Sequence, residues 1–248
     1  MYQQERLNNI MDIVRKNGYV TVKFLTEELH YSNATINRDL NILEKQNLIK
    51  RSYGGVEAVK NVSSALVFRY HKMKVAKNKI GKKAAEFIED GDTIFIDAST
   101  TAQYIGKYIT ERKNLTVITN NMTLVSYLSE HNINAICLGG KVVEIPSMLS
   151  GVETVENAMK YYADKMFFSV GAISDDGKIG SSDLYYLLHK VMMQNSKNTF
   201  LLIDSGKINK PTKKFYPPDI IPGHIITDYD FEEKTKNKYK NTNFITIK

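Results

Sequence analysis

From residue 93 to the end of the chain, short apolar runs alternate with amphipathic segments. The runs are TIFID, LTVIT, NAICLGG, KMFFSVGAI, TFLLID and HIITD, and segments such as TAQYIGKYI and MTLVSYLSEH lie between them. Parallel strands need a long crossover connection, which is usually a helix, so this alternation is typical of a parallel sheet. The sequence therefore predicts a large α/β domain with a mainly parallel sheet over residues 91–248.

The first 60 residues have a different pattern, in which three helices precede a short hairpin. Apolar residues recur at helical spacing from Leu7, and Gly18 marks a stop. Thr21 and Ser32 are the expected N-caps of the next two helices. The stretch IKRSYGGVEAV predicts a two-stranded hairpin that turns at Gly54–Gly55. We expect a winged helix-turn-helix domain over 1–60, then a linker and connecting helix over 61–90.

The third helix begins in SNATINRDLN and has two unlike faces. Ile36, Leu40 and Leu43 form an apolar face, and asparagines and one arginine lie opposite. A polar stripe is usually solvated surface, but here a helix and a tight turn precede it, as in DNA-binding proteins. Asn and Arg side chains also bind base edges bidentately. The expected DNA contacts are Ser32, Asn33, Ala34, Thr35, Asn37, Arg38 and Asn41 on the helix and Lys50, Arg51 and Tyr53 on the wing.

Composition narrows the function classes without choosing among them. The chain has 34 Lys and Arg against 27 Asp and Glu, a net charge of +7, which favours a polyanionic partner. The single cysteine, Cys137, excludes an internal disulfide and is expected to be a buried, inert thiol. The five histidines are scattered, so no metal or other cofactor is expected. No apolar run is long enough to cross a membrane, and we expect a cytoplasmic protein.

The stretch VTVKFLTEELHYSNATINRDLNILEKQNLIKRSYGGV resembles the N-terminal domain of the DeoR family of bacterial transcription regulators. The positions that match the family pattern are Ser32, Thr35, Ile36, Arg38, Asp39, Leu40, Leu43, Glu44, Gly54 and Gly55. Asn37 departs from it, because the family usually has an arginine there. By the base-edge code, this change favours adenine over guanine and removes a cation that could bind phosphate.

Four expected strands of the α/β domain end in polar or glycine-rich segments. These are Asp97–Thr101, Thr119–Asn120, Gly139–Lys141 and Asp204–Lys207. Ligands of open α/β sheets bind at the carboxyl ends of the strands, and a helix start attracts anions. Each segment alone is usually a turn, but together they predict a phosphorylated polar ligand. The candidate effector residues are Asp97, Ser99, Thr100, Thr101, Thr119, Asn120, Gly139, Gly140, Lys141, Gly171, Asp183 and Lys207.

The resemblance extends over this domain too. The DeoR effector domain is similar to ribose-5-phosphate isomerase and carries Asp-x-Gly-Thr-Thr, Thr-Asn, Leu-Gly-Gly and Asp-Ser-Ser-Lys motifs, which map onto the four segments. The resemblance implies a repressor of a carbohydrate uptake or catabolism operon, controlled by a bound sugar phosphate. Ser99 replaces the loop glycine of the family, and Tyr185 and Tyr186 replace an acidic pair. The two tyrosines are expected to pack rather than to stack on a sugar.

A sugar-phosphate isomerase is the alternative function from another class. That chemistry needs a carboxylate base near the substrate. The isomerases place acidic residues where this chain has FFSVGAIS, residues 167–174, which contains neither Asp nor Glu. We therefore expect a regulator and not an enzyme. Its expected partners are a double-stranded DNA operator and a phosphorylated sugar, and it is expected to form a homodimer or homotetramer that spans neighbouring major grooves.

Overall fold

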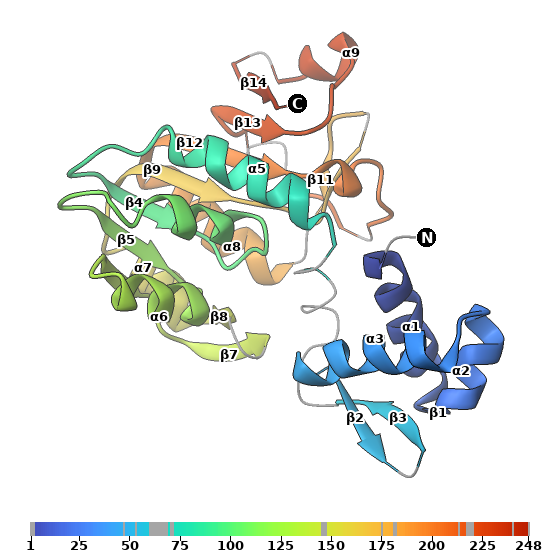
Figure 1. Ribbon diagram of the computed structural model, residues 1–248. Coiled ribbons are helices and arrows are strands. Elements are labelled where there is room, and N and C mark those ends of the chain that lie inside the picture. The colour runs from blue at the N-terminus through green and yellow to red at the C-terminus, as the bar shows by residue number, and fades with distance from the viewer. Residues whose placement is uncertain are drawn as a thin grey trace. The chain divides into compact units, whose positions relative to one another are not determined.

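A computed structural model describes most of the chain. The described residues are 3–46, 48–52, 54–59, 69, 72–144, 148–174, 176–180, 183–212, 214–216, 221–239 and 241–247. They form two compact units that divide between His71 and Lys72 (Figure 1). Much of the expected linker over 61–90 lies outside the described residues, and its helix packs within the second unit. Tyr53, an expected DNA contact on the wing, also lies outside them.

The first unit contains three helices and a small antiparallel sheet. Its elements are α1 (Gln3–Asn17), β1 (Tyr19–Thr21), α2 (Val22–Leu29), α3 (Asn33–Lys45), β2 (Ile49–Ser52) and β3 (Gly55–Ala58). Both expected N-caps are confirmed: Thr21 accepts a hydrogen bond from the Phe24 amide and Ser32 from the Thr35 amide. The left-handed backbone of His30, with φ 56°, makes the turn between α2 and α3.

The wing is larger than the expected two-stranded hairpin. Strands β2 and β3 form the hairpin, and β1 adds a third strand, in the order β1-β3-β2. Val20 and Val56 face each other in the β1–β3 pair and are both buried. Burial of this valine pair explains why the short segment before α2 joins the sheet. The apolar face predicted for α3 is confirmed, because Ile36, Leu40 and Leu43 lie in the core of this unit.

The second unit is built on a seven-stranded sheet in which every neighbouring pair is parallel (Figure 1). The strand order is β14-β13-β12-β9-β4-β5-β6. This confirms the predicted α/β class. The strands are β4 (Thr93–Ile96), β5 (Thr116–Thr119), β6 (Asn134–Cys137), β9 (Ala163–Phe168), β12 (Ser196–Ile203), β13 (His224–Thr227) and β14 (Asn243–Thr246).

Helices cover both faces of this sheet, and the strands alternate their side chains between two cores. Ile94 and Ile96 point into one core and Phe95 into the other. The helices over the first core are α5 (Lys74–Ala85), the 3-10 helix η1 (Ala102–Tyr108) and α6 (Met122–Glu130). Those over the second are α7 (Val152–Ala158) and α8 (Asp183–Gln194). The carboxyl ends of the central strands therefore open between two helical layers.

Several shorter elements were not foreseen. They are the hairpins β7 (Lys141–Glu144) with β8 (Met148–Ser150) and β10 (Ala172–Ile173) with β11 (Ile179–Gly180), and the 3-10 helix η2 (Ser205–Lys207). A short helix, α9 (Glu233–Lys236), lies between β13 and β14 in the sequence. The expectation for Cys137 was wrong, because it is exposed. It ends β6, an edge strand with a neighbour on one side, so its apolar surroundings in the sequence did not imply burial.

Candidate DNA-binding surface and effector site

The structure brings most of the expected DNA contacts to one side of α3 and to the adjoining wing. Side chains that are exposed or partly exposed are those of Ser32, Asn33, Ala34, Thr35, Asn37, Arg38, Asn41, Lys50 and Arg51. Arg38 and Asn41 are exposed, whereas Asn37 is partly covered. The surface is therefore accessible to a partner, and Asn37 lies at its covered edge.

Arg51 of β2 covers Asn37 by reaching across to α3. Its Nη1 donates to Asn37 Oδ1 at 3.0 Å, and its Nη2 donates to the Asn37 carbonyl at 3.0 Å and to Asn41 Oδ1 at 2.8 Å. Glu44 Oε2 lies 3.5 Å from Arg51 Nε. The amide nitrogen of Asn37 is also used, because it donates to the Asn33 carbonyl at 2.9 Å. Both ends of the Asn37 side chain are therefore engaged within the unit.

A buried ion pair fixes α3 to α1. Asp39 is fully buried and accepts hydrogen bonds from Nε and Nη2 of Arg6, the second at 3.1 Å. Donation of these hydrogen bonds to Asp39 raises the pKa of Arg6. The Arg6 guanidinium also lies 4.9 Å from the ring centre of Tyr31, in the turn before α3. These contacts fix the orientation of α3, since a buried charge must keep its partner.

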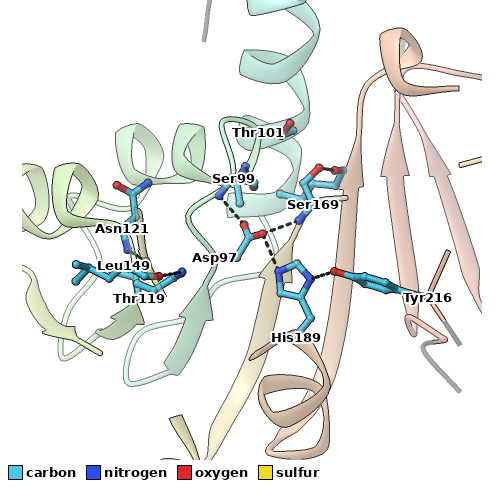
Figure 2. A network of polar contacts seen from close by, with 12 residues as sticks. Asp97, Ser99, Thr101, Thr119, Asn121, Leu149, Ser169, His189 and Tyr216 are labelled. Atoms are coloured by element: carbon cyan, nitrogen blue, oxygen red, sulfur yellow. Dashed lines mark hydrogen bonds and ion pairs between the residues drawn. The ribbon is translucent and has the colours of Figure 1, made fainter. Parts of the chain in front are cut away.

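Among the effector candidates, Asp97 follows β4 directly, is 1% exposed and lies in a network of polar contacts (Figure 2). Its carboxylate accepts from the Ser99 and Ser169 amides and from Nε2 of His189, each at 3.1 Å. A carboxylate only accepts, so Nε2 of His189 carries a proton, and Nδ1 is hydrogen-bonded to the Tyr216 hydroxyl at 3.0 Å. Asp97 therefore holds the 97–101 loop in place and has no unused oxygen for a ligand.

Two lysines from different elements meet the consecutive threonines of this loop. Lys77 Nζ of α5 donates to Thr100 Oγ1 at 3.0 Å, and Lys207 Nζ of η2 donates to Thr101 Oγ1 at 2.9 Å. Lys207 also donates to Ser169 Oγ at 2.7 Å and lies 3.5 Å from Asp204 Oδ2. Lys77 is 2% exposed and both threonines are buried. Hydroxyls and ammonium groups gathered at a strand end are suited to an anion such as phosphate.

Lys77 was not among the residues predicted from the sequence, although the sequence contains a signal for it. In KVAKNKIGKK, most lysines fall on the solvent side of the helix. Lys77 instead lies three positions before Ile80 and seven before Ala84, which places it on the buried face. A lysine within an apolar stripe is unusual enough to mark a functional candidate.

The Thr119–Asn120 pair ends β5 beside the same sheet edge but makes internal bonds. Thr119 Oγ1 accepts from the Asn121 amide at 3.0 Å. Asn120 Nδ2 donates to the Leu149 carbonyl at 2.8 Å, which fastens β8 to this strand end. Among the described residues, Oδ1 of the buried Asn120 has no hydrogen-bond partner. Asn120 thus offers one acceptor, and Thr119 acts within the turn.

The glycine-rich segment after β6 has a packing role. The left-handed Gly140, with φ 108°, approaches α7 so closely that a Cβ there would lie 2.1 Å from Thr154 Oγ1. Thr154 in turn donates to the Gly139 carbonyl at 2.8 Å. Lys141 begins β7 and is exposed. These contacts place the β7–β8 hairpin, and they leave a ligand role for the segment as a prediction.

The remaining candidates lie on the β10–β11 side. Gly171 is exposed, and its amide donates to the Gly180 carbonyl at 3.0 Å. Asp183 is the first residue of α8, and its side chain is outside the described part of the chain. Neither residue is brought to the lysine pair by a contact that the structure describes. Both stay predictions.

The two departures from the family pattern have structural explanations. Ser99 Oγ accepts from the Ala102 amide at 3.1 Å, so this hydroxyl caps the start of η1. Tyr185 and Tyr186 pack against the core, with ring centres 5.9 Å from His189 and 5.4 Å from Tyr216 respectively. The tyrosines therefore pack, as expected, and they support the network around Asp97.

Lys210 adds a further cation near this site. Lys210 is exposed, but partial desolvation of its ammonium and the neighbouring charge of Lys72 lower its pKa to about 8, and Asp204 and Lys207 are close enough to act on it as well. An ordinary lysine has a pKa of about 10.4. Desolvation is the larger cause of this shift and the neighbouring positive charge the smaller one, so Lys210 keeps most of its charge at neutral pH.

Comparison with known proteins identifies the family. The DeoR C-terminal sensor domain matches residues 72–228, and the DeoR-like helix-turn-helix domain matches residues 6–62. The chain belongs to the DeoR family. It is a DNA-binding transcriptional regulator. Its named relatives are repressors and not enzymes, which contradicts the isomerase alternative.

The curated relatives cover most of the chain. The transcriptional repressor GlcR of Bacillus subtilis is 34% identical over 84% of this chain and 81% of its own. The glycerol-3-phosphate regulon repressor of Escherichia coli is 30% identical over 85% and 84%. The lactose phosphotransferase system repressor of Streptococcus mutans is 30% identical over 99% and 100%. The similarity of this DeoR-family protein to these repressors therefore extends over both of its units.

Solved structures give weaker likenesses. Ribose 5-phosphate isomerase A from Methanocaldococcus jannaschii matches with a TM-score of 0.41 and 14% identity over 55% of each chain. Translation initiation factor eIF-2B from Pyrococcus horikoshii matches with a TM-score of 0.44 over 86% of this chain and 74% of that one. Likenesses of this size say nothing about function.

Among the described residues, none of the helices is long and apolar enough to span a bilayer, and no group of three or more His, Cys, Asp and Glu side chains could hold a metal.

Proposed function

We propose that this DeoR-family protein represses a carbohydrate uptake or catabolism operon and that a phosphorylated sugar in the second unit controls it. The observation that carries the proposal is the pair of lysines, Lys77 and Lys207, on the consecutive hydroxyls of Thr100 and Thr101. A phosphate monoester carries close to two negative charges at neutral pH and has several acceptor oxygens. It would give both ammonium groups anionic acceptors in place of neutral hydroxyls, and such ion pairs are stronger.

The proposed phosphate site joins residues predicted from the sequence to one that was not. Thr100, Thr101 and Lys207 were expected, and Lys77 is added. Asp97 and Ser99 hold the loop through their own hydrogen bonds. Asn120, with a free buried acceptor at the next strand end, is suited to a ligand hydroxyl. A group rich in hydroxyls and carrying one phosphate, as in a phosphorylated sugar, fits this set.

We propose that α5 carries the effect of the ligand toward the DNA-binding unit. This helix begins just after the division between the units and holds Lys77 near its start. Its N-cap, Met73, has a left-handed backbone with φ 56°, and a Cβ on Gly206 would lie 2.8 Å from Met73 Cγ. Met73 thus contacts η2, and Lys77 contacts the 97–101 loop. A ligand that binds both segments would change the contacts at the start of α5. It could then favour one arrangement of the DNA-binding unit over another, which requires a different affinity for the two arrangements.

The DNA-bound form is proposed to be a homodimer or homotetramer in the bacterial cytoplasm. Helix-turn-helix regulators place two recognition helices in neighbouring major grooves, and an operator repeat mirrors the symmetry of the protein. The exposed side of α3 supplies the surface for one half-site. Sedimentation of the protein with and without a duplex tests this part. A protein that stays a monomer on DNA would contradict it.

A thermal-shift screen tests the proposed control. The panel contains glycerol 3-phosphate, hexose and pentose phosphates, each beside its unphosphorylated form, and inorganic phosphate. We expect a phosphorylated sugar to raise the melting temperature of the second unit, whereas its unphosphorylated form does not. The double variant Lys207→Met/Thr100→Val should lose this shift and keep DNA binding. Equal shifts with both forms, or DNA binding lost together with the shift in a folded variant, would refute the assignment.

A further inference from the structure

Arg51 belongs to the wing in sequence but to α3 in its contacts. Its guanidinium makes three hydrogen bonds to α3, two to Asn37 and one to Asn41. Its side chain is 31% exposed. The oxygens that it meets on Asn37 and Asn41 are neutral, and Glu44 lies farther away, at 3.5 Å from Nε. The helix thus fixes the orientation of the guanidinium, and the ion pair with Glu44 offsets part of its charge.

The position of this guanidinium is informative because of the residue beneath it. Asn37 is neutral and meets Arg51 at 3.0 Å, so an arginine at this position would bring a second guanidinium close to the first. Two guanidinium groups repel each other, whereas the Asn37 amide oxygen and carbonyl oxygen both accept from Arg51. One guanidinium therefore lies over this part of α3, supplied by β2.

We propose that Arg51 reads a base pair at the recognition surface and that Asn37 is the positioning residue that aims it, rather than a reader of adenine. The expected target is the O6 and N7 edge of a guanine, which arginine binds bidentately. Arg51 would exchange its Asn41 contact for the base and keep its two bonds to Asn37. A phosphate contact needs no such fixed orientation, and Lys50 beside it is exposed and suited to that role.

Selection from a random-sequence duplex library tests the proposal, because it needs no known operator. The full-length proteins compared are the wild type, Arg51→Ala, Arg51→Lys, Asn37→Ala and the swap Asn37→Arg/Arg51→Asn, with Lys50→Ala as the control. Competition binding between the selected duplex and duplexes changed at one base pair gives the discrimination at each position. Circular dichroism checks the fold, and Arg51→Lys keeps the charge and the apolar stem if Arg51→Ala unfolds.

We expect Arg51→Ala and Arg51→Lys to lower discrimination at one guanine position by about 10- to 100-fold. Asn37→Ala should weaken the preference at that same position, and the swap should restore it. Lys50→Ala should weaken binding to all duplexes alike. The proposal is overturned if Arg51→Lys binds every duplex as the wild type does, if Asn37→Ala alters a different base pair, or if the wild type shows no guanine preference that depends on Arg51.

Discussion

The α3 surface and the 97–101 loop are built alike and differ in how they meet solvent. Each is fixed by a buried aspartate, Asp39 in the first unit and Asp97 in the second. Each also holds cations against neutral oxygens, Arg51 on Asn37 and Asn41 in one case and Lys77 on Thr100 in the other. In both units, a rigid anchor and a cation on neutral acceptors form an arrangement that fits the proposed anionic partner.

The difference lies in burial. The Arg51 side chain is 31% exposed, whereas Lys77 is 2% exposed. A charge near the surface interacts through high dielectric and is screened by salt, so it suits a long polyanion that is bound at many points. A buried ammonium interacts through lower dielectric, so a single small anion can gain substantially from it. The exposed site therefore fits DNA, and the buried one fits a metabolite.

Removal of the two anchors should show the largest effects and should separate the units. Asp39→Asn leaves Arg6 without its charged partner, which typically costs a few kcal/mol for a buried pair. Because Arg6 keeps some contact with water, we expect the first unit to lose about 3 kcal/mol of stability and DNA binding to fail. Hydrogen exchange in α3 measures the loss, with exchange in β4 and β9 as the unchanged reference.

Asp97→Asn is the matched change in the second unit. The amide puts a donor where Asp97 accepts from two backbone N–H groups and His189, so one of these bonds must be lost. We expect a cost of about 1–3 kcal/mol, localised to the 97–101 loop and α8. If Asp39→Asn disturbs the second unit as much as the first, the two sites are not independently anchored and the comparison fails.

The sequence predicted more about the frameworks of these two sites than about their cations. The alternation of apolar runs predicted the parallel sheet, and the caps at Thr21 and Ser32 predicted two helix starts, because these signals are local and periodic. The contact between Arg51 and Asn37 could not be predicted, since it joins a strand to a helix fourteen positions away. Whether such a pair forms depends on tertiary packing and not on the secondary-structure propensity of either segment.

The same limit applies to the effector site. Thr100, Thr101 and Lys207 follow strand ends, a position that is readable from sequence, and they were predicted. Lys77 lies on α5, before β4 in the sequence, so a search for polar residues that follow strands does not find it. Thr119 and Gly140 also obey that rule; Thr119 bonds within its turn and Gly140 packs against α7, and a ligand role for either stays a prediction. A strand-end residue is thus a candidate whose role depends on what packs beside it.

Lys77→Met should have the second-largest effect and tests the buried cation directly. It removes one charged donor from the proposed phosphate site and keeps an apolar stem of similar length. We expect affinity for the phosphorylated sugar found by the thermal-shift screen to fall about 10- to 100-fold, the range of a charge-assisted hydrogen bond. Calorimetric titration measures it. DNA affinity without the sugar should stay unchanged.

Lys82→Met is the control for that variant. It lies on the same helix, removes the same charge and is exposed. At an exposed site this change should cost less than about 1 kcal/mol of binding energy. Equal losses from the two variants would mean that the general positive field of α5 attracts the anion, and burial of Lys77 would then not distinguish the effector site from the DNA surface.

The smallest expected effect concerns pH and Lys210. Its pKa is lowered to about 8 by partial desolvation and by Lys72, so part of its charge is lost in mildly alkaline solution. An anion bound nearby favours the protonated lysine. The contribution of Lys210 is therefore fully present below this pKa and disappears as the pH rises through it. The second pKa of a phosphate monoester is about 6, so the ligand keeps its charge over this range.

We therefore expect affinity for the phosphorylated sugar to fall about 2- to 5-fold between neutral pH and a pH well above 8, the size of a partly exposed ion interaction. Lys210→Met should bind more weakly at neutral pH and show a flatter dependence, whereas Lys82→Met should follow the wild type. DNA binding through Arg51 should lack this dependence, because a guanidinium does not titrate there. A dependence of equal size in Lys210→Met would place the titrating group elsewhere and remove Lys210 from the effector site.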